Sequence, residues 1–283
     1  MLPKRTYGRH QDRLSIIGLG GLVVAQLDQS EADRIVGDAF DRGVNYYDVA
    51  PTYMDAEERL GPALKPYRQR SFLACKTEKR TKAEADAALN ESLKKLQTDH
   101  FDLYQLHGLP NLEEAQTCFA RGGAMETLIA ARDQGLTRYL GFSAHSVEAA
   151  LFCLAEFPFD SVLFPLSWPA YYAGRFGPQV IDTAVQSGAA VLALKAMARG
   201  PWPDGATREY PKCWYQPFDT VADAERALRW TLSLPVTAAV PPGDTRLFEL
   251  ALTIAERFEP ISDPDIQRMQ DAAKSCTPLF AVA

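Results

Sequence analysis

Short apolar runs alternate with longer amphipathic stretches along the whole chain. The first clear amphipathic stretch begins at Ser30 and stops at Gly43. Its apolar side chains recur at i, i+3, i+4, i+7 and i+8, and they are Ala32, Ile35, Val36, Ala39 and Phe40. This spacing is typical of one face of a helix, and glycine commonly follows a helix end. The shorter apolar runs, such as residues 72–76, are typical of strands.

The alternation predicts eight strands, each followed by a helix. We expect strands over residues 14–18, 45–48, 72–76, 101–107, 139–143, 161–164, 190–194 and 237–240. After the helix that begins at Ser30, we expect one that begins at Thr81 and others over residues 56–64, 124–134, 146–155, 178–187, 222–233, 246–258 and 264–274. Eight such units predict an α/β fold, a (β/α)8 TIM barrel with one domain over residues 1–283. No GxGxxG follows the first strand, so the fingerprint of an open dinucleotide-binding sheet is missing.

Four residues with useful chemistry lie at the ends of these predicted strands. Asp48, Lys76 and His107 each end an apolar run, and Tyr53 follows Asp48 closely. The ends of parallel barrel strands meet at one mouth, so we expect these four side chains to lie together. A phenol beside an ammonium is a proton donor that carbonyl reduction can use. An ammonium about 4 Å away would favour the phenolate by up to about 4 kcal/mol at an effective dielectric of about 20.

Two connections are longer than usual and rich in aromatic residues. They cover residues 165–177 and 197–219, and both follow predicted strands. Four of their aromatic residues are candidates for the wall of a substrate pocket, namely Trp168, Tyr172, Trp202 and Trp214. Packing of the loops against the barrel is an equally good interpretation.

Composition narrows the class of protein. The formal charge is −6 and no run of like charges occurs, which argues against a general nucleic-acid binder. Five scattered cysteines without a CxxC motif favour a reduced, cytoplasmic compartment. No apolar run approaches the roughly 20 residues of a membrane span. The four scattered histidines suggest no metal site, and nothing in the sequence sets the oligomeric state.

The motifs around these residues resemble those of the aldo-keto reductases. The segment from Asp48 to Tyr53 with Leu60 and Gly61 resembles the first signature of that family, and Lys76 and His107 match its other catalytic strand ends. Further matches are Leu128 with Gly135, residues 138–143, residues 227–230 with Leu234 and Pro235, and Val240 with Pro241. The resemblance covers essentially the whole chain, in the same order.

This resemblance implies an NAD(P)H-dependent oxidoreductase that reduces a small-molecule carbonyl to an alcohol. Tyr53 would be the general acid, Lys76 would lower its pKa, Asp48 would hold Lys76, and His107 would orient the carbonyl. The implied cofactor is NADP, with NAD as the alternative. Its expected contacts are Gly20, Ser143, Lys195, Arg199, Gly243, Arg246 and Glu249. The chain departs from the family pattern at Ala144, at Phe164 with Pro165, and at Leu194, where the family has asparagine, glutamine and an aromatic residue.

Two other functions stay open from the sequence. The substituted nicotinamide contacts would suit a nucleotide-binding barrel that senses the redox state of its cofactor and turns over weakly. A Schiff-base lyase could use Lys76 as its nucleophile, because barrel lysines with a lowered pKa can form imines. Asp48 beside Lys76 would raise that pKa instead, which places the lyase last.

Overall fold

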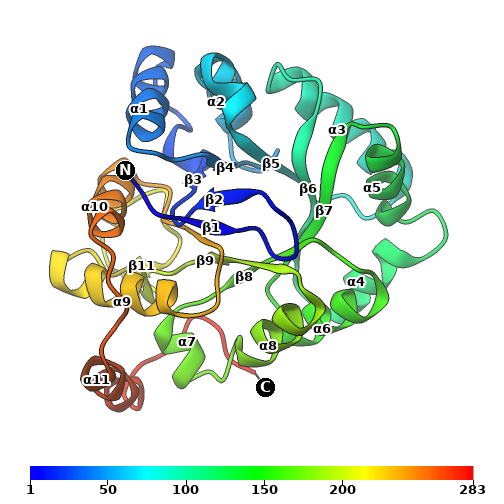
Figure 1. Cartoon of the computed structure of the whole chain (residues 1–283). Helices are drawn as coiled ribbons and strands as arrows, with labels where there is room; N and C mark the ends of the chain where they lie inside the picture. Colours follow the sequence, from blue (N-terminus) through cyan, green and yellow to red (C-terminus); the bar gives the residue numbers. More distant parts are fainter. Residues whose placement is uncertain (283) are drawn as a thin grey trace.

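Eight parallel strands form a barrel at the centre of the molecule. The computed structural model describes residues 1–282, and Figure 1 shows the strands surrounded by helices. The strands are β3 (Leu19–Gly20), β4 (Tyr46–Asp48), β5 (Phe72–Thr77), β6 (Phe101–Leu109), β7 (Thr137–Ala144), β8 (Ser161–Pro165), β9 (Ala190–Leu194) and β12 (Ala238–Val240). Neighbours in the sheet are also neighbours in this list. The predicted (β/α)8 fold is confirmed.

The barrel closes through residues just before β3. Ile17 bridges in parallel to Ala239. The Gly18 amide donates to the Ala239 carbonyl at 2.9 Å, and the Ala239 amide donates to the Ile16 carbonyl at 2.8 Å. A Cβ on Gly18 would lie 2.4 Å from the Tyr46 ring, so only glycine fits at this closure.

The helices form the outer layer. They are α1 (Gln29–Asp41), α2 (Ala56–Leu64), α3 (Lys82–Lys95), α4 (Leu112–Phe119), α5 (Ala124–Asp133), α6 (Val147–Glu156), α7 (Trp168–Tyr172), α8 (Pro178–Ser187), α9 (Val221–Ser233), α10 (Thr245–Glu256) and α11 (Asp263–Ala273), with the 3₁₀ turns η1 (Gly21–Val23) and η2 (Lys65–Arg70). Every predicted helix is present. Helices α4 and α7 were not predicted.

The prediction of the first strand was wrong in part. Leu14 and Ser15 belong to β2 (Arg13–Ser15), which pairs antiparallel with β1 (Lys4–Thr6), and the barrel strand starts only at Leu19. This hairpin packs against the beginnings of the barrel strands, where Leu14 joins Tyr7, Tyr46 and Phe72 in one buried cluster. The hairpin therefore closes the end of the barrel opposite the mouth. A second small hairpin, β10 (Ala198–Gly200) with β11 (Gln216–Pro217), lies within the long connection after β9.

Alternation along the strands separates two cores. Tyr46, Phe72, Ala74 and Leu103 share one buried cluster inside the barrel. Their chain neighbours pack in the other cluster, between the barrel and the helices, and include Tyr47, Leu73, Cys75 and Tyr104. Because side chains alternate along a strand, Asp48, Lys76 and His107 continue the inward series. The strand period thus aims these polar residues into the barrel, at its mouth.

Candidate active site

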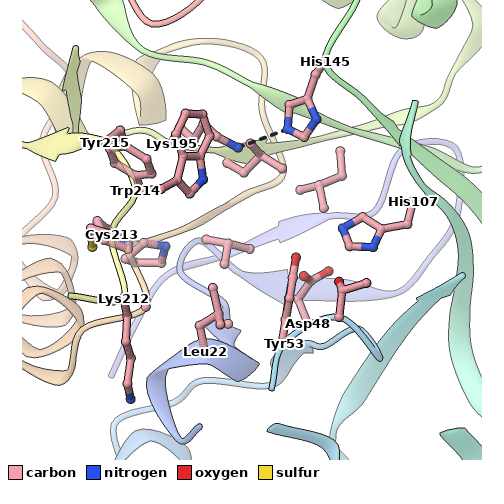
Figure 2. Close-up of a pocket in the computed structure, with 18 residues that line it drawn as sticks. Leu22, Asp48, Tyr53, His107, His145, Lys195, Lys212, Cys213, Trp214 and Tyr215 are labelled. Atoms are coloured by element: carbon pink, nitrogen blue, oxygen red, sulfur yellow. Dashed lines mark hydrogen bonds between the residues drawn. The ribbon is translucent and has the colours of Figure 1, made fainter. Parts of the chain in front are cut away.

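Asp48, Tyr53, Lys76 and His107 lie together at the mouth of the barrel, as the sequence predicts. Figure 2 shows Asp48, Tyr53 and His107 around one cavity, and all three line it. Asp48 ends β4, Lys76 is the fifth residue of β5, and His107 lies near the end of β6. Tyr53 is in the turn after β4, where its amide donates to the Ala50 carbonyl at 3.0 Å.

Lys76 is the buried cation of this group. Its side chain is fully buried and forms an ion pair with Asp48, and its Nζ also donates to the Val49 carbonyl at 3.1 Å. The Tyr46 hydroxyl donates to the other Asp48 oxygen at 2.9 Å. Burial alone would lower the pKa of Lys76, but Asp48 and Tyr53 raise it above its ordinary value. Lys76 is therefore an ammonium at neutral pH.

The ring of Tyr53 lies near both this ammonium and the imidazole of His107. The Lys76 Nζ is 5.2 Å from the centre of the Tyr53 ring, and the ring meets His107 edge-on at 5.6 Å between centroids. Burial raises the pKa of Tyr53, Lys76 lowers it, and Asp48 raises it again. The net pKa is above the ordinary value, so the depressed pKa expected from the sequence is not found. The phenol stays protonated at neutral pH.

His107 is a neutral imidazole. Burial lowers its pKa well below the ordinary value, and Lys76, His145, Arg80 and Lys195 lower it further. Its Nδ1 is buried and has no hydrogen-bond partner within residues 1–282. A neutral imidazole with a proton on the nitrogen that faces the cavity can donate one hydrogen bond to a carbonyl oxygen.

The cavity at this mouth has a volume of about 430 Å³. Its apolar wall includes Leu163, Leu194 and Val240, and its rim comes from η1, the loop before β11 and the loop after β12. Lys212 ties two of these rims together, because its Nζ donates to the Val23 and Ala25 carbonyls at 3.3 and 2.6 Å. The loop that contains Lys212 is therefore tied to η1 and the turn after it at the rim of the cavity.

The residues expected to bind the cofactor fall into two groups. Gly20, Gly243 and Lys195 line the cavity, whereas Ser143, Arg199, Arg246 and Glu249 do not. The Ser143 hydroxyl accepts a hydrogen bond from the Gly108 amide at 2.7 Å.

The remaining charged candidates already have partners of opposite charge. Arg199 pairs with Asp223 at 3.4 Å, and Glu249 pairs with Arg42 of the α1 end at 2.8 Å. Arg246 pairs with Asp244 at 3.0 Å and lies 4.5 Å over the Tyr210 ring. Sequence alone could not show the pairs of Arg199 and Glu249, because each joins elements that are distant in the sequence and meet only in the folded chain.

Of the aromatic residues expected to line the substrate pocket, only Trp214 lines this cavity. Trp168 is buried with Phe218 and Trp230 in a cluster between α7, α9 and α11. The Tyr172 hydroxyl accepts a hydrogen bond from the Trp230 indole at 2.9 Å, and the Trp202 indole donates to the Cys213 carbonyl at 2.9 Å. These three residues therefore pack and order the loops, which was the alternative interpretation.

Sequence reasoning missed several lining residues, namely Leu22, Thr52, His145, Lys212, Cys213 and Tyr215. His145 follows β7 by one residue, so its position at a strand end was a usable signal. The others lie in loops or turns that the strand pattern does not place. Within residues 1–282, no three histidine, cysteine or acidic side chains cluster as metal ligands. No helix among the same residues is both long and apolar enough to cross a membrane.

Comparison with known proteins identifies the family of this chain. The model of the aldo/keto reductase family matches residues 16–274. The chain is 32% identical over 158 residues to the uncharacterized oxidoreductase YqkF of Bacillus subtilis, a match that covers 50% of this chain and 48% of YqkF. It is 27% identical over 209 residues to the aldo-keto reductase YhdN of the same species, covering 68% of this chain and 60% of YhdN. The matches thus span about half to three fifths of these curated relatives.

Solved structures have the same fold. The holo form of aldo-keto reductase AKR11C1 from Bacillus halodurans superposes with a TM-score of 0.74 over 98% of both chains, at 23% sequence identity. At this identity the likeness shows the barrel architecture. Together with the match of the family model to nearly the whole chain, it leads to one conclusion. This chain belongs to the aldo/keto reductase family, a family of oxidoreductases.

Proposed function

We propose that this protein reduces the aldehyde or ketone group of a small molecule to an alcohol, using NAD(P)H. The observation that carries the proposal is the meeting of a protonated phenol, a neutral imidazole and a buried ion pair at one cavity. These groups supply a proton, a hydrogen-bond donor and a fixed positive charge. The cofactor, when bound, supplies the hydride that the carbonyl carbon receives.

Tyr53 provides the proton in this scheme. Its hydroxyl donates to the carbonyl oxygen as negative charge develops there, and a phenolate remains on Tyr53. The developing alkoxide is more basic than a phenolate, so the transfer is favourable even though the pKa of Tyr53 is raised. The proton returns to Tyr53 from solvent once the alcohol has left.

Lys76, Asp48 and His107 support that transfer. The Lys76 ammonium lies near the Tyr53 ring and stabilises the phenolate that forms. Asp48 keeps Lys76 charged and fixed, and the neutral His107 donates a hydrogen bond that orients the carbonyl oxygen. The raised pKa of Lys76 also argues against the Schiff-base lyase, because an imine requires a neutral amine.

The residues of the cavity fit the nicotinamide end of the cofactor. Leu163, Leu194 and Val240 offer an apolar wall for a flat ring. A Cβ on Gly20 would lie 2.9 Å from Val240, and one on Gly243 would lie 2.4 Å from Leu22. Because glycine has no Cβ at these two positions, the neighbouring segments pack closely and no side chain projects from either glycine into the cavity.

We propose NADP as the preferred cofactor, with NAD as the alternative. Arg246 lies in the first turn of α10, where helix amides and a guanidinium can meet one phosphate. Its side chain is more than half exposed. Asp244 opposes this preference. Its carboxylate accepts hydrogen bonds from both the amide and the guanidinium of Arg246, the groups that would bind the phosphate. A 2′-phosphate must share Arg246 with Asp244.

Cofactor binding followed by turnover tests the proposed reductase against the redox sensor. Titration with NADPH should quench the tryptophan fluorescence, and an aromatic aldehyde should then make the 340 nm absorbance of NADPH fall. One alcohol should form for each NADPH consumed. Tight binding without aldehyde-dependent oxidation would contradict the reductase and favour the sensor.

A further inference from the structure

Lys195 lies on the cavity wall, and no group of opposite charge lies beside it within residues 1–282. Within residues 1–282 its Nζ has one hydrogen-bond partner, the Nε2 of His145 at 3.1 Å, and no carboxylate pairs with it. This differs from Lys76, which has Asp48. Ionising a half-buried lysine without a counter-charge costs free energy, and an anion that bound beside the lysine would offset that cost.

Aromatic rings surround the same ammonium. The Nζ lies 5.4 Å from the centre of the Trp214 ring and 5.6 Å from that of Phe280. Phe280 stacks on His145 with its centroid 5.5 Å away and the ring planes 8° apart. These rings restrict where the ammonium can point and leave the cavity as its open side. Figure 2 shows Lys195 and His145 on one side of the cavity and Asp48 and Tyr53 on the other.

The backbone also holds Lys195 in an unusual conformation. Its φ is +64°, in the left-handed region that a residue with a long side chain rarely adopts. Such strain is common at functional sites. It occurs directly after Leu194, the last residue of β9 and itself part of the cavity wall. The turn therefore directs Lys195 inward, where an extended residue would continue along the strand.

His145 acts as a positioning residue for Lys195. When Lys195 is charged its Nζ can only donate, so the Nε2 of His145 then accepts and the imidazole proton is on Nδ1. Burial lowers the pKa of His145 to about 3, which keeps the imidazole neutral and able to accept. Burial also lowers the pKa of Lys195 to about 7, so an anion that arrived would hold the lysine in its charged form.

We propose that Lys195, held by His145, forms an anion subsite in the cavity, and that the carbonyl substrate carries a carboxylate or phosphate that binds there. The proposal rests on the proposed reductase function and names its substrate class. Lys195 and Tyr53 line the same cavity of about 430 Å³, so a molecule that fills this cavity would contact both. The anion would lie at Lys195 while the carbonyl faces Tyr53 and His107.

A matched pair of aldehydes tests the subsite. The anion 4-formylbenzoate and the neutral 4-formylbenzamide have nearly the same size and the same reacting group. Wild type should prefer the anion in kcat/KM by about tenfold or more, as expected for a hydrogen bond to a charged group. Lys195→Met should abolish the preference, and Lys195→Arg should keep part of it. The readout is the ratio of the two kcat/KM values, so a loss of rate that is common to both aldehydes cancels.

A phosphate of the cofactor is the competing anion, and the dissociation constant of NADPH separates the two. The subsite predicts that Lys195→Met binds NADPH as tightly as wild type. Weaker NADPH binding with an unchanged preference between the two aldehydes would assign Lys195 to the cofactor and overturn the proposal. An equal preference in wild type and Lys195→Met would overturn it too.

A binding experiment without turnover keeps this test independent of the reductase function. Benzoate should change the tryptophan fluorescence of wild type, because Trp214 lies over Lys195. Lys195→Met should bind benzoate about tenfold more weakly than wild type, because it lacks the hydrogen bond to the charged carboxylate. It should bind the neutral benzamide as tightly as wild type does. Benzoate binding that depends on Lys195 in a protein without reductase activity would support the subsite and refute the reductase. Benzoate binding that is unchanged in Lys195→Met would refute the subsite.

Discussion

The positions of the candidate site residues follow from the alternation of side chains along each strand and from the ion pairs that charged residues form. Asp48, Lys76 and His107 share the inward face because each is an even number of positions from a residue of the inner core. The same reasoning could not place Arg199, Arg246 or Glu249, which lie outside the barrel strands and form ion pairs with Asp223, Asp244 and Arg42. The period of a strand specifies which face each of its side chains lies on. It does not specify which charged residues outside the strands form ion pairs.

Arg246 offers a test of cofactor choice at this scale. Arg246→Ala should raise the dissociation constant of NADPH about tenfold or more, because a hydrogen bond to a charged phosphate contributes about 1.5–3 kcal/mol. The dissociation constant of NADH should stay nearly unchanged. Asp244→Asn should do the opposite and tighten NADPH binding. Asparagine still caps α10, so the variant removes the competing charge without removing the cap. Dissociation constants of both cofactors decide it. Equal losses for NADPH and NADH in Arg246→Ala would show that Arg246 does not recognise the 2′-phosphate.

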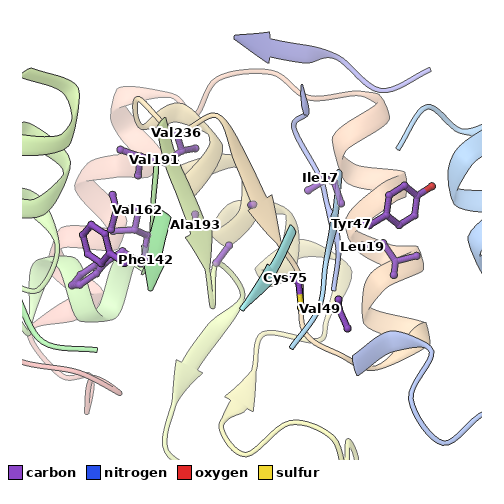
Figure 3. Packing of buried hydrophobic residues seen from close by; sticks show 14 of the residues in the cluster. Ile17, Leu19, Tyr47, Val49, Cys75, Phe142, Val162, Val191, Ala193 and Val236 are labelled. Atoms are coloured by element: carbon purple, nitrogen blue, oxygen red, sulfur yellow. The ribbon is translucent and has the colours of Figure 1, made fainter. Parts of the chain in front are cut away.

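Among the helices, those with a long apolar face were predictable, whereas the short helices α4 and α7 were not. Figure 3 shows Tyr47, Cys75, Phe142 and Val191 in the buried layer outside the strands, which the helices cover with their own apolar faces. Helix α4 has a usable start signal, since the Asn111 side chain accepts from the Glu114 amide at 2.9 Å, but its face is only two turns long. The strands β10 and β11 are too short to show a periodic pattern in the sequence, so their pairing could not be predicted.

Two glycines within helices test how closely these elements pack. A Cβ on Gly61 of α2 would lie 2.7 Å from the Lys95 carbonyl at the end of α3, whereas one on Gly37 of α1 would meet only the Tyr67 hydroxyl at 3.1 Å. Gly61→Ala should therefore destabilise by about 1–3 kcal/mol through overpacking. Gly37→Ala should be neutral or stabilise by up to about 1 kcal/mol through helix propensity. Urea unfolding measures both. A Gly61→Ala variant as stable as Gly37→Ala would contradict the close contact of α2 and α3.

At the scale of the whole molecule, the site carries two partly buried imidazoles that stay neutral. The pKa of His107 lies well below its ordinary value, and the pKa of His145 is about 3. An unfolded histidine has a pKa of about 6.5. As the pH falls below that value, the unfolded chain binds protons that the folded chain does not, so stability falls. The closed barrel that buries the site thus makes the protein sensitive to mild acid.

Glutamine at both positions should reduce this sensitivity. Between about pH 7.5 and about pH 5.0, each histidine should account for at most about 2 kcal/mol of lost stability, from about 1.36 kcal/mol per pKa unit. The double variant His107→Gln, His145→Gln should lose correspondingly less free energy of unfolding over that range. The check is urea unfolding of both proteins at the two pH values. Equal losses would show that the imidazoles are not buried in their neutral form.

Hydride transfer in a single turnover tests most directly whether Tyr53 donates the proton. Tyr53→Phe removes one hydroxyl and keeps the ring that meets His107 and Lys76. With enzyme in excess over NADPH and aldehyde saturating, the rate of NADPH oxidation should fall about 10²- to 10⁴-fold, the range for general acid catalysis. The dissociation constant of NADPH should stay nearly the same. A rate within about threefold of wild type, which is far less than the loss of a general acid causes, would contradict the assignment of Tyr53 as the acid.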